Sequence, residues 1–410
     1  MALTGIEPIL HEKLAELDRR GTRKGDEQVI CGVKPAANGL GPRYQLTGQG
    51  EEEFLRMNSN SYLGLGLHPA VIAAEEAGVK AFGVGPGAVR FISGSHAPHL
   101  QLEARLARFH QRPAAMLFSA AYATVMGVLP QLIDAETAVV SDELNHNCII
   151  NAIRLARPAA KAVYKHNDMD DLEAALQKLI GQAQRVLVVS DGIFSMRGDH
   201  APLDRLVALC GQYEGRFPQG IITVVDDSHG VGAFGATGRG VEEHCDARAD
   251  ILIGTLGKAF GVNGGYLAAS ETVIRYLRET APFYIYSNPI TPAEAAAALK
   301  AVDIVDSEEG VRLLAHLREM TRRFEDGLAA LGCEFLPGPH PIVPLLVRDT
   351  ARTGQLVDIL FSRQILATGI KFPVVPRGDE EIRFQINASH TEADIDSVLV
   401  ALRDFRQQSP

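Results

Sequence analysis

Residues 220–230 read "GIITVVDDSHG", an apolar run that ends abruptly in two acids and a histidine. Two further segments have the same form, "RVLVVSDG" at 185–192 and "DILIGTLGK" at 250–258. Such runs are typical of parallel strands buried on both faces, with functional groups at their carboxyl ends. Helical patterns such as 168–182 and 202–215 alternate with them. The chain is therefore predicted to have an α/β fold with crossover helices and a mostly parallel central sheet.

The length of the chain, 410 residues, predicts more than one domain, because a single core usually stops growing near ~250–300 residues. An alanine-rich helical segment at 291–307 begins a region with a different sequence pattern, which contains β-like runs such as 381–389. We predict a large central domain over residues 61–295. A smaller α/β domain would be built from residues 1–60 together with 296–410.

Composition excludes several classes of function. A net charge of −10 argues against a nucleic-acid-binding protein, which would show a basic face. Residues 114–133 carry no charge and are long enough to span a bilayer, but they include Pro130 and Gln131. We interpret them as a buried strand end followed by a core helix, and expect no membrane association. The five cysteines are scattered, which predicts free thiols in a reducing, cytoplasmic setting, without a disulfide framework or a metal centre.

Lys258 is a single cation in the otherwise apolar and glycine-rich run "DILIGTLGKAFGVNGGY" (250–266), with no acid within seven residues. Burial without a carboxylate would lower its pKa and give a neutral amine suited to a Schiff base. The alternative is a solvated loop lysine. A nucleotide P-loop is excluded, because no Ser or Thr follows the lysine and Leu252 stands at the position of the first glycine.

Asp226 and His229 lie at the end of the apolar run in 220–230 and are expected to face a ligand at the end of the predicted strand. A carboxylate opposite a pyridine nitrogen would keep that nitrogen protonated, which is the electron sink of pyridoxal phosphate. His229 could donate to the phenolic oxygen of the same ring. The alternative is a capped turn in which Asp227 or Ser228 starts a helix.

Three further features complete this pattern. His146 could stack on an aromatic ring, although a structural histidine is the alternative. Backbone N–H groups in "FSAAYATV" (118–125) could hold a phosphate at a helix N-terminus, unless Ser119 merely caps that helix. Arg383 could bind a substrate carboxylate, or be an edge-strand arginine facing solvent. An amine, a pyridine partner, a stacking ring, a phosphate cradle and a carboxylate clamp are the parts of a pyridoxal phosphate enzyme.

The chain resembles the α-oxoamine synthases, which are fold-type I, aspartate aminotransferase-like pyridoxal phosphate enzymes. The resemblance runs from "NSNSYLGLGLHP" (58–69) to "ASHTEADI" (388–395). The segments "VRFISGSHAPHLQLE" (89–103), "NHNCIINAIRL" (145–155) and "FPVVPRG" (372–378) are most similar to the glycine C-acetyltransferase branch. The motifs "SDELNHNCII", "DGIFSMRGD", "VVDDSHGVGAFGATGRG" and "GTLGKAFG" also carry it.

The resemblance implies a role for each matching residue. Lys258 corresponds to the Schiff-base lysine, Asp226 to the pyridinium partner and His229 to the phenolic-oxygen donor. His146 corresponds to the ring-stacking histidine and Ser195 to the serine near the ring. The remaining matches are the phosphate contacts Ala121, Tyr122 and Thr255, the substrate-carboxylate contacts Asn60 and Arg383, and the residues Ser287 and Asn288 that a homodimer would lend to its neighbour's active site.

The family pattern is not matched everywhere. Arg197 in "FSMRGD" stands where the family usually has an acid, Ser61 replaces an Asn or Asp, and Pro289 replaces a small hydroxylated residue. The loop "GKAFGVNGGY" is also one residue shorter than in the acetyltransferases. Arg197 and Ser61 leave the identity of the acyl group and the amino acid open.

The activity that the resemblance implies is condensation of a small amino acid, glycine most of all, with acetyl-CoA or another short acyl-CoA. The product would be a 2-amino-3-keto acid or, after decarboxylation as in 8-amino-7-oxononanoate synthases, an α-amino ketone. An aminotransferase on the same fold is the alternative enzyme. A catalytically silent subunit or a DNA-binding regulator is the alternative outside enzymes; the presence of Lys258 argues against the first and the lack of a basic segment against the second.

Overall fold

The computed structural model describes residues 3–20, 23, 27–372 and 375–408, and it forms two compact units. The larger unit comprises Asn60–Arg318 with Pro339–Pro341. The smaller comprises Met1–Ser59, Glu319–Gly338 and Ile342–Pro410. One boundary therefore falls inside helix α12 (Glu308–Ala330), later in the chain than residue 295. The limits predicted for folding domains stay a prediction.

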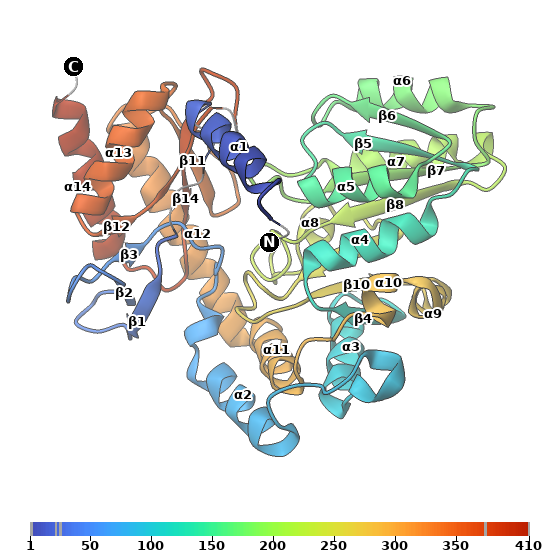
Figure 1. Ribbon diagram of the computed structural model, residues 1–410, viewed down its shortest axis with the longest axis horizontal. Helices are drawn as coiled ribbons and strands as arrows, with labels where there is room; N and C mark the ends of the chain where they lie inside the picture. The colour runs from blue at the N-terminus through green and yellow to red at the C-terminus, as the bar shows by residue number, and fades with distance from the viewer. Residues whose placement is uncertain (1–2, 21–22, 24–26, 373–374, 409–410) are drawn as a thin grey trace. The chain divides into compact units, whose positions relative to one another are not determined.

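The larger unit is built on a seven-stranded sheet with the order β4-β10-β9-β8-β7-β5-β6 (Figure 1). Strands β5 to β9 pair in parallel, and β10 runs antiparallel to its neighbours β9 and β4. The predicted mostly parallel central sheet is thus confirmed. The strands are β4 (Ala114–Phe118), β5 (Thr137–Asp142), β6 (Ala160–Tyr164), β7 (Arg185–Asp191), β8 (Ile221–Asp226), β9 (Ile251–Thr255) and β10 (Gly265–Ala269).

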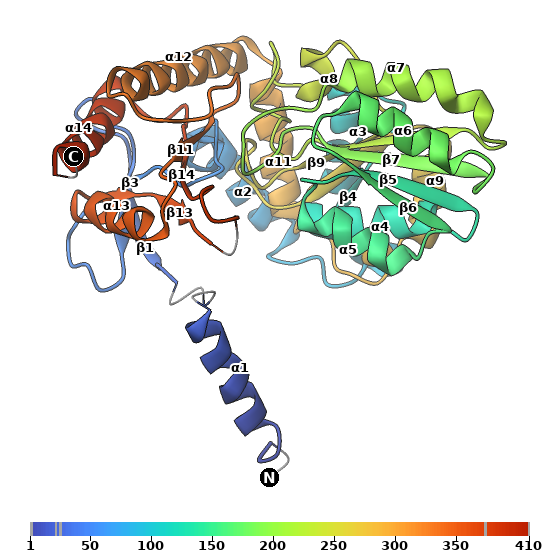
Figure 2. The ribbon, with the colours of Figure 1, turned by 90° about the horizontal axis from the view of Figure 1, so that it is seen from above.

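Helices cover both faces of this sheet, so that the sheet lies between α4 and α5 on one side and α6 and α7 on the other (Figure 2). Leu187 and Val189 of β7 pack into the first layer, and Val186 and Val188 into the second. Burial on both faces explains why these strands are continuous apolar runs. The first layer contains α4 (Ala121–Leu132), α5 (Asn147–Ala156), α9 (Glu271–Thr280) and α10 (Pro282–Ile285); the second contains α6 (Met169–Leu179), α7 (Leu203–Tyr213) and α8 (Val241–His244).

The uncharged stretch 114–133 forms strand β4 and helix α4, as interpreted from the sequence. Within the described part of the chain, no helix is both long and apolar enough to cross a membrane. Beyond the two layers, helix α11 packs against α2 and α3. The elements of this region are η1 (Leu65–Leu67), α2 (Pro69–Phe82), η2 (Arg90–Gly94), α3 (Ala97–Phe109) and α11 (Pro292–Val305), while η3 (Glu214–Arg216) continues directly from α7.

The smaller unit has a three-stranded antiparallel sheet in which β14 lies between β11 and β13. An antiparallel pair β1–β2 and a parallel pair β3–β12 accompany it. Every residue of α1 is exposed or half-buried. The elements are α1 (Glu7–Arg19), β1 (Ile30–Lys34), β2 (Arg43–Leu46), β3 (Leu55–Arg56), β11 (Ile342–Leu346), α13 (Thr350–Ser362), β12 (Ile365–Leu366), β13 (Thr368–Ile370), β14 (Glu381–Gln385) and α14 (Glu392–Gln408).

Candidate active site

A pocket in the larger unit brings most of the predicted residues together at the carboxyl ends of β7, β8 and β9. This is the edge at which open parallel sheets usually bind ligands. We call it the Lys258 pocket. Its lining residues are Ala121, Tyr122, His146, Cys148, Asp191, Ile193, Ser195, Asp226, Ser228, His229 and Lys258.

Asp226 is the last residue of β8, and it is only 6% exposed. Its Oδ1 accepts hydrogen bonds from the backbone N (3.1 Å) and Oγ (2.6 Å) of Ser228, which fix the carboxylate. Its Oδ2 lies 3.9 Å from the Sγ of Cys148. Residues 228–230 form a turn. The alternative in which Asp227 or Ser228 starts a helix is therefore wrong.

The second acid of the pair, Asp227, has a structural role. Its side chain is fully buried, and its Oδ2 accepts from the backbone N of Val241 at 2.7 Å, which ties the following loop to the start of α8. Gly240 must be glycine, since its φ is +88° and a Cβ there would lie 1.8 Å from Asp227 Oδ2. Burial raises the pKa of Asp227 well above its usual value.

His146 lies at the N-cap of α5 and presents a neutral ring to the pocket. Its Nδ1 accepts from the backbone N of Cys148 (3.3 Å) and lies 2.9 Å from the Cys148 Sγ. Its backbone N donates to Asp191 Oδ2 at 3.0 Å. Partial desolvation lowers the pKa of His146, in agreement with a ring whose Nδ1 is an acceptor. A neutral planar ring is suited to stacking on a heterocycle.

Lys258 lies in the turn after β9 and is half-buried. The prediction of an amine remote from carboxylates is wrong for the folded chain, because Asp191 and Asp226 line the same pocket as Lys258. Burial, followed by the proximity of Asp226, raises the pKa of Asp191. Strands distant in sequence thus supply two acids that the local sequence of Lys258 lacks.

Ala121 and Tyr122 begin helix α4 at the edge of the pocket, so the free N–H groups of its first turn lie where a phosphate was predicted. The N-cap of α4 is Ala120, and its side chain makes no capping bond. The capping role considered for Ser119 is therefore wrong.

Gly265→Ala tests how tightly this helix start is packed. A Cβ at Gly265 would lie 2.4 Å from Thr124 Oγ1 and 2.5 Å from the backbone N of Ala121. Because backbone atoms cannot move aside cheaply, we expect a loss of about 1–3 kcal/mol in the free energy of unfolding, measured by urea denaturation. The matched change Gly211→Ala, in α7 with no atom within 4 Å of its Cβ, should instead stabilise by up to about 1 kcal/mol. Equal stability of the two variants would contradict this.

Ser195 lies on a loop held by His166. The ring of His166 contacts Asp142 Oδ1 at 3.2 Å and Asp199 Oδ2 at 3.0 Å, and it packs edge-on against Phe194. Arg197 Nε donates to the same Asp199 Oδ2 at 3.0 Å. The cation that departs from the family pattern thus belongs to the network that supports this loop.

His166 predicts a dependence of stability on pH. Burial disfavours its charged ring, but the carboxylates of Asp142 and Asp199 outweigh burial and raise the pKa of His166 to about 9. This pKa is above the value of about 6.5 for an unfolded histidine. The charged ring of His166 therefore stabilises the folded state fully below about pH 6.5, and this contribution is lost as the pH rises through about 9. Urea denaturation of the wild type should show this decline, and His166→Gln should flatten it; parallel curves would contradict the assignment.

Some predicted residues lie outside the pocket lining. Thr255 is buried, and its hydroxyl donates to the Gly264 carbonyl at 3.1 Å. Ser287 and Asn288 follow α10. Arg383 belongs to the smaller unit and lies on the central strand β14, so the edge-strand alternative is wrong. The roles of these residues stay predictions, and residues 373–374 of "FPVVPRG" lie outside the described structure.

The structure adds pocket residues that the sequence reasoning missed. Asp191 ends β7 beside Asp226, and the strand-end pattern that identified Asp226 could also have identified it. Cys148, Ile193 and Ser228 lie within motifs that were noted for other residues. Tyr62 gave no signal, because it reaches His229 from 167 residues away.

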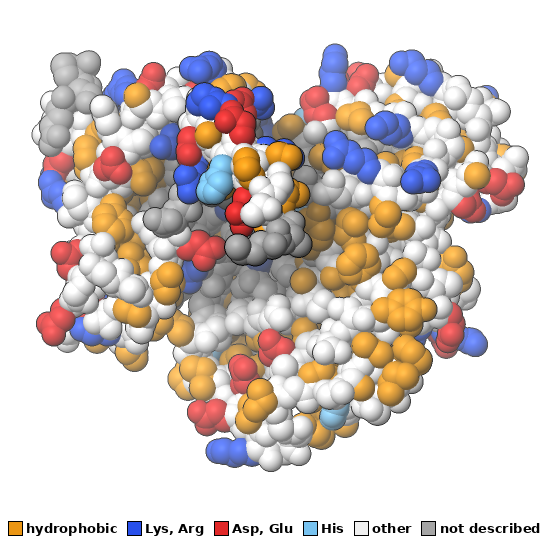
Figure 3. All heavy atoms as spheres, in the orientation of Figure 1, with side chains coloured by type: hydrophobic (Ala, Val, Ile, Leu, Met, Phe, Trp, Pro, Cys, Tyr) orange, Lys and Arg blue, Asp and Glu red, His pale blue; other side chains and the backbone are white. Residues whose placement is uncertain are grey.

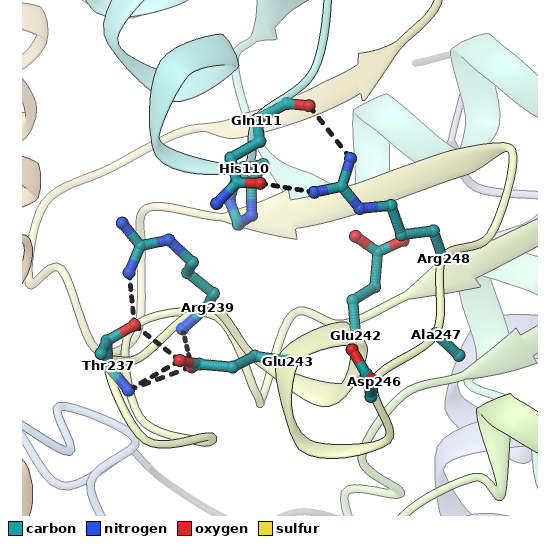
Figure 4. Close-up of a pocket in the computed structure, with 9 residues that line it drawn as sticks. All are labelled: His110, Gln111, Thr237, Arg239, Glu242, Glu243, Asp246, Ala247 and Arg248. Carbon is teal, nitrogen blue, oxygen red and sulfur yellow. Dashed lines mark hydrogen bonds between the residues drawn. The ribbon is translucent and has the colours of Figure 1, made fainter.

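A second pocket of the larger unit shares no residue with the Lys258 pocket (Figure 4). Several of its charged side chains form hydrogen bonds with neighbouring side chains and backbone groups. Arg248 donates to the carbonyl and side-chain oxygens of Gln111 at 3.2 and 2.8 Å, and Glu243 accepts from Thr237 and Arg239. The lining residues are His110, Gln111, Thr237, Arg239, Glu242, Glu243, Asp246, Ala247 and Arg248.

The chain is similar to known proteins of one family. The family model "Aminotransferase class I and II" matches residues 52–402. The chain is 38% identical to 8-amino-7-oxononanoate synthase 1 of Bacillus velezensis, over 96% of this chain and 97% of that one. It is 39% identical to the mitochondrial 2-amino-3-ketobutyrate coenzyme A ligase of Bos taurus, over 98% and 92%. The chain belongs to the α-oxoamine synthase family. It is thus a pyridoxal phosphate-dependent enzyme.

Solved structures agree with this α-oxoamine synthase assignment. Serine palmitoyltransferase of Sphingomonas wittichii matches with a TM-score of 0.87 and 26% identity, over 99% of this chain and 98% of that one. A lysine-to-alanine variant of serine palmitoyltransferase from S. paucimobilis, with a bound PLP–myriocin aldimine, matches with a TM-score of 0.86 and 25% identity, over 99% and 98%.

The Lys258 pocket fits pyridoxal phosphate by the chemistry of its groups. The aldehyde of the coenzyme would react with an amine, which Lys258 supplies. Its pyridine nitrogen would need an acid, and the carboxylate of Asp226, which Ser228 holds in place, is such a group. The neutral ring of His146 suits the face of the coenzyme, and the helix start at Ala121 suits its phosphate. The α-oxoamine synthase fold and the side chains of the Lys258 pocket thus both indicate pyridoxal phosphate as the coenzyme.

Proposed function

We propose that this α-oxoamine synthase condenses a small amino acid, glycine most of all, with a short acyl-CoA and releases CoA. The observation that carries the proposal is the common pocket of Lys258 and Asp226, in a chain similar to enzymes named 2-amino-3-ketobutyrate coenzyme A ligase and 8-amino-7-oxononanoate synthase. Glycine with acetyl-CoA, without decarboxylation, is the preferred reaction.

Lys258 and Asp226 perform the central proton steps of this proposal. Lys258 would hold the coenzyme through Nζ, and its amine would take the proton from the α-carbon of the amino acid. Asp226 keeps a proton on the pyridine nitrogen. When bound, the coenzyme supplies the electron sink that makes this α-carbon acidic. The α-carbon then attacks the thioester carbonyl, the C–S bond breaks, and CoA leaves as the thiolate, which takes up a proton.

The remaining pocket residues bind and orient. His146 would lie against the face of the coenzyme and would donate from Nε2 to the thioester oxygen as charge develops there. His229 would donate to the phenolic oxygen of the coenzyme, and Ser195 would contact its ring. Ala121 and Tyr122 bind the phosphate through backbone N–H groups.

Other contacts come from residues outside the pocket lining. Thr255 adds a hydroxyl to the phosphate, while Asn60 and Arg383 hold the substrate carboxylate. These assignments rest on the family resemblance of each residue.

We also propose a homodimer with shared active sites, in which Ser287 and Asn288 bind the phosphate in the neighbouring subunit. Hydrophobic side chains gather on the face of the larger unit over α4 and α10 (Figure 3). Tyr286, next to this pair, is 75% exposed, and Phe91 and Ile92 of η2 are 63% and 65% exposed. Large exposed apolar side chains support an interface with a second copy. The free cysteines support a cytoplasmic location.

A matrix of amino acids against acyl-CoA thioesters tests the proposed reaction, with thiol release and carbon dioxide both measured. We expect thiol release with glycine and acetyl-CoA and no carbon dioxide. Equal amounts of thiol and carbon dioxide would instead indicate the decarboxylating reaction. Amino transfer to a keto acid without thiol release would contradict the proposal and indicate an aminotransferase.

A further inference from the structure

A pocket on the smaller unit combines an apolar wall with three arginines, and the proposed reaction does not use it. It lies where helix α13 packs against α14, beside the end of β11 and the turn that follows α12 (Figure 1). Its volume is about 420 Å³, which is within the usual range for small-molecule sites, about 300–1,000 Å³. We call it the α13–α14 pocket.

The wall of the α13–α14 pocket is apolar, because two helices and a strand supply core side chains to it. Half-buried Leu346 and Val347 continue this surface at the end of β11. A hydrocarbon chain lying on the wall would remove apolar surface of both partners from water, which favours binding. The buried apolar side chains of the lining are Leu345, Leu356, Leu402 and Phe405.

One of the three arginines, Arg348, is neutralised by the chain itself. Its Nε lies 3.3 Å from Glu334 Oε2, its Nη2 donates to Glu334 Oε1, and its Nη1 lies 3.0 Å from Asp379 Oδ1. Hydrogen bonds from Arg348 lower the pKa of Glu334, so this acid of the lining is charged and already paired. Glu334 is therefore not available to balance the other two arginines.

Arg352 and Arg406 are exposed and have no carboxylate partner within the described part of the chain. The Arg352 guanidinium lies 5.9 Å from the centre of the Phe405 ring, and no described group forms a hydrogen bond or an ion pair with it. Arg406 Nη1 donates to the backbone oxygen of Leu331 and lies 3.7 Å from Cys333 Sγ, and both of these partners are neutral. In a protein of net charge −10, the pocket is thus a local excess of positive charge.

We propose that the α13–α14 pocket binds a small amphiphilic anion, an aliphatic carboxylate whose chain lies along the leucines and whose head group is held by Arg352 and Arg406. A guanidinium binds a carboxylate through two parallel N–H donors, and no described group occupies those of Arg352. A purely polar anion would leave the apolar wall in water, and an uncharged chain would leave the two cations unbalanced. The pocket shares no residue with the Lys258 pocket, so the proposal depends on neither the coenzyme nor the proposed reaction.

Isothermal titration calorimetry of the full-length holoenzyme with decanoate tests the proposal. We expect saturable binding at one site per chain, and Arg352→Ala and Arg406→Ala should each weaken it about ten- to a hundredfold, because each removes hydrogen bonds to a charged group. Both side chains are exposed, so the variants should fold, and their melting temperatures check this. A wild type that binds no decanoate, or an affinity that both variants retain in full, would overturn the proposal.

Arg403→Ala is the matched control, because Arg403 is an exposed arginine on the same helix α14 that does not line the pocket. It should bind decanoate as the wild type does; an equal loss there would trace the effect to the overall charge of the protein and overturn the proposal. Acetate has the head group without the chain, and decanol has the chain without the charge. Each should bind at least about tenfold more weakly than decanoate, and an affinity of either equal to that of decanoate would also overturn the proposal.

Discussion

Lys258→Ala is expected to lower kcat by about three to four orders of magnitude and to leave the protein folded. The substitution removes both the covalent attachment of the coenzyme and the base that takes the α-proton, and general bases contribute about 10²–10⁴-fold on their own. Lys258 is half-buried in a turn flanked by Gly257, so truncation to alanine leaves no large cavity. Initial rates of thiol release at saturating substrates measure the loss.

The control for this variant is Lys300→Ala, which removes an exposed lysine within α11 in the same unit. Its kcat should match the wild type. A Lys258→Ala variant that keeps more than a tenth of the wild-type kcat, with its coenzyme still resistant to dialysis, would contradict both roles of the lysine.

Asp226→Asn is expected to lower kcat by about 10²–10⁴-fold with little change in stability. The amide keeps an oxygen to accept from Ser228, but it cannot hold a proton on a pyridine nitrogen by charge, and each pKa unit lost there corresponds to about 1.4 kcal/mol. Turnover and thermal unfolding should be measured on the same samples. The signature is a large fall in kcat beside an almost unchanged melting temperature.

Asp250→Asn is the matched control. Asp250 Oδ2 accepts hydrogen bonds from the backbone N of Thr223 at 2.8 Å and from the Thr223 Oγ1 at 2.7 Å. Ser228 makes the same pair of bonds to Asp226. The bonds to Asp250, however, lie near the start of β8 and outside the Lys258 pocket. Asp250→Asn should alter stability as much as Asp226→Asn and leave kcat unchanged. Comparable losses of kcat in both variants would mean that the carboxylate of Asp226 acts only on the fold.

The central sheet and the pocket could be predicted from sequence because strands and function share one local signal. Strands β7, β8 and β9 are buried on both faces, so each is a continuous apolar run, and the polar residue that ends a run lies at the functional edge. Asp226 and Lys258 were found in this way. The role of Asn60 came from the resemblance alone, whereas Arg383 was first noted as a cation in a β-like run.

Other features leave no local signal. Helix α12 runs without interruption through the boundary between the two compact units, so no break in secondary structure marks that boundary in the sequence. Tyr62 and His340 reach His229 from distant positions, and only the folded chain brings them together. The acids near Lys258 likewise come from neighbouring strands, which is why its local sequence suggested an isolated amine.

Peptide mapping after borohydride reduction tests the central claim most directly, because reduction makes the bond between the coenzyme and its lysine permanent. The holoenzyme is reduced, digested and analysed by mass spectrometry. We predict that the added mass of a reduced pyridoxyl phosphate lies on Lys258, in the peptide containing "GTLGKAFG", and that excess glycine supplied before reduction diminishes it. A modification on another lysine, or a reduced protein carrying no coenzyme, would contradict the account.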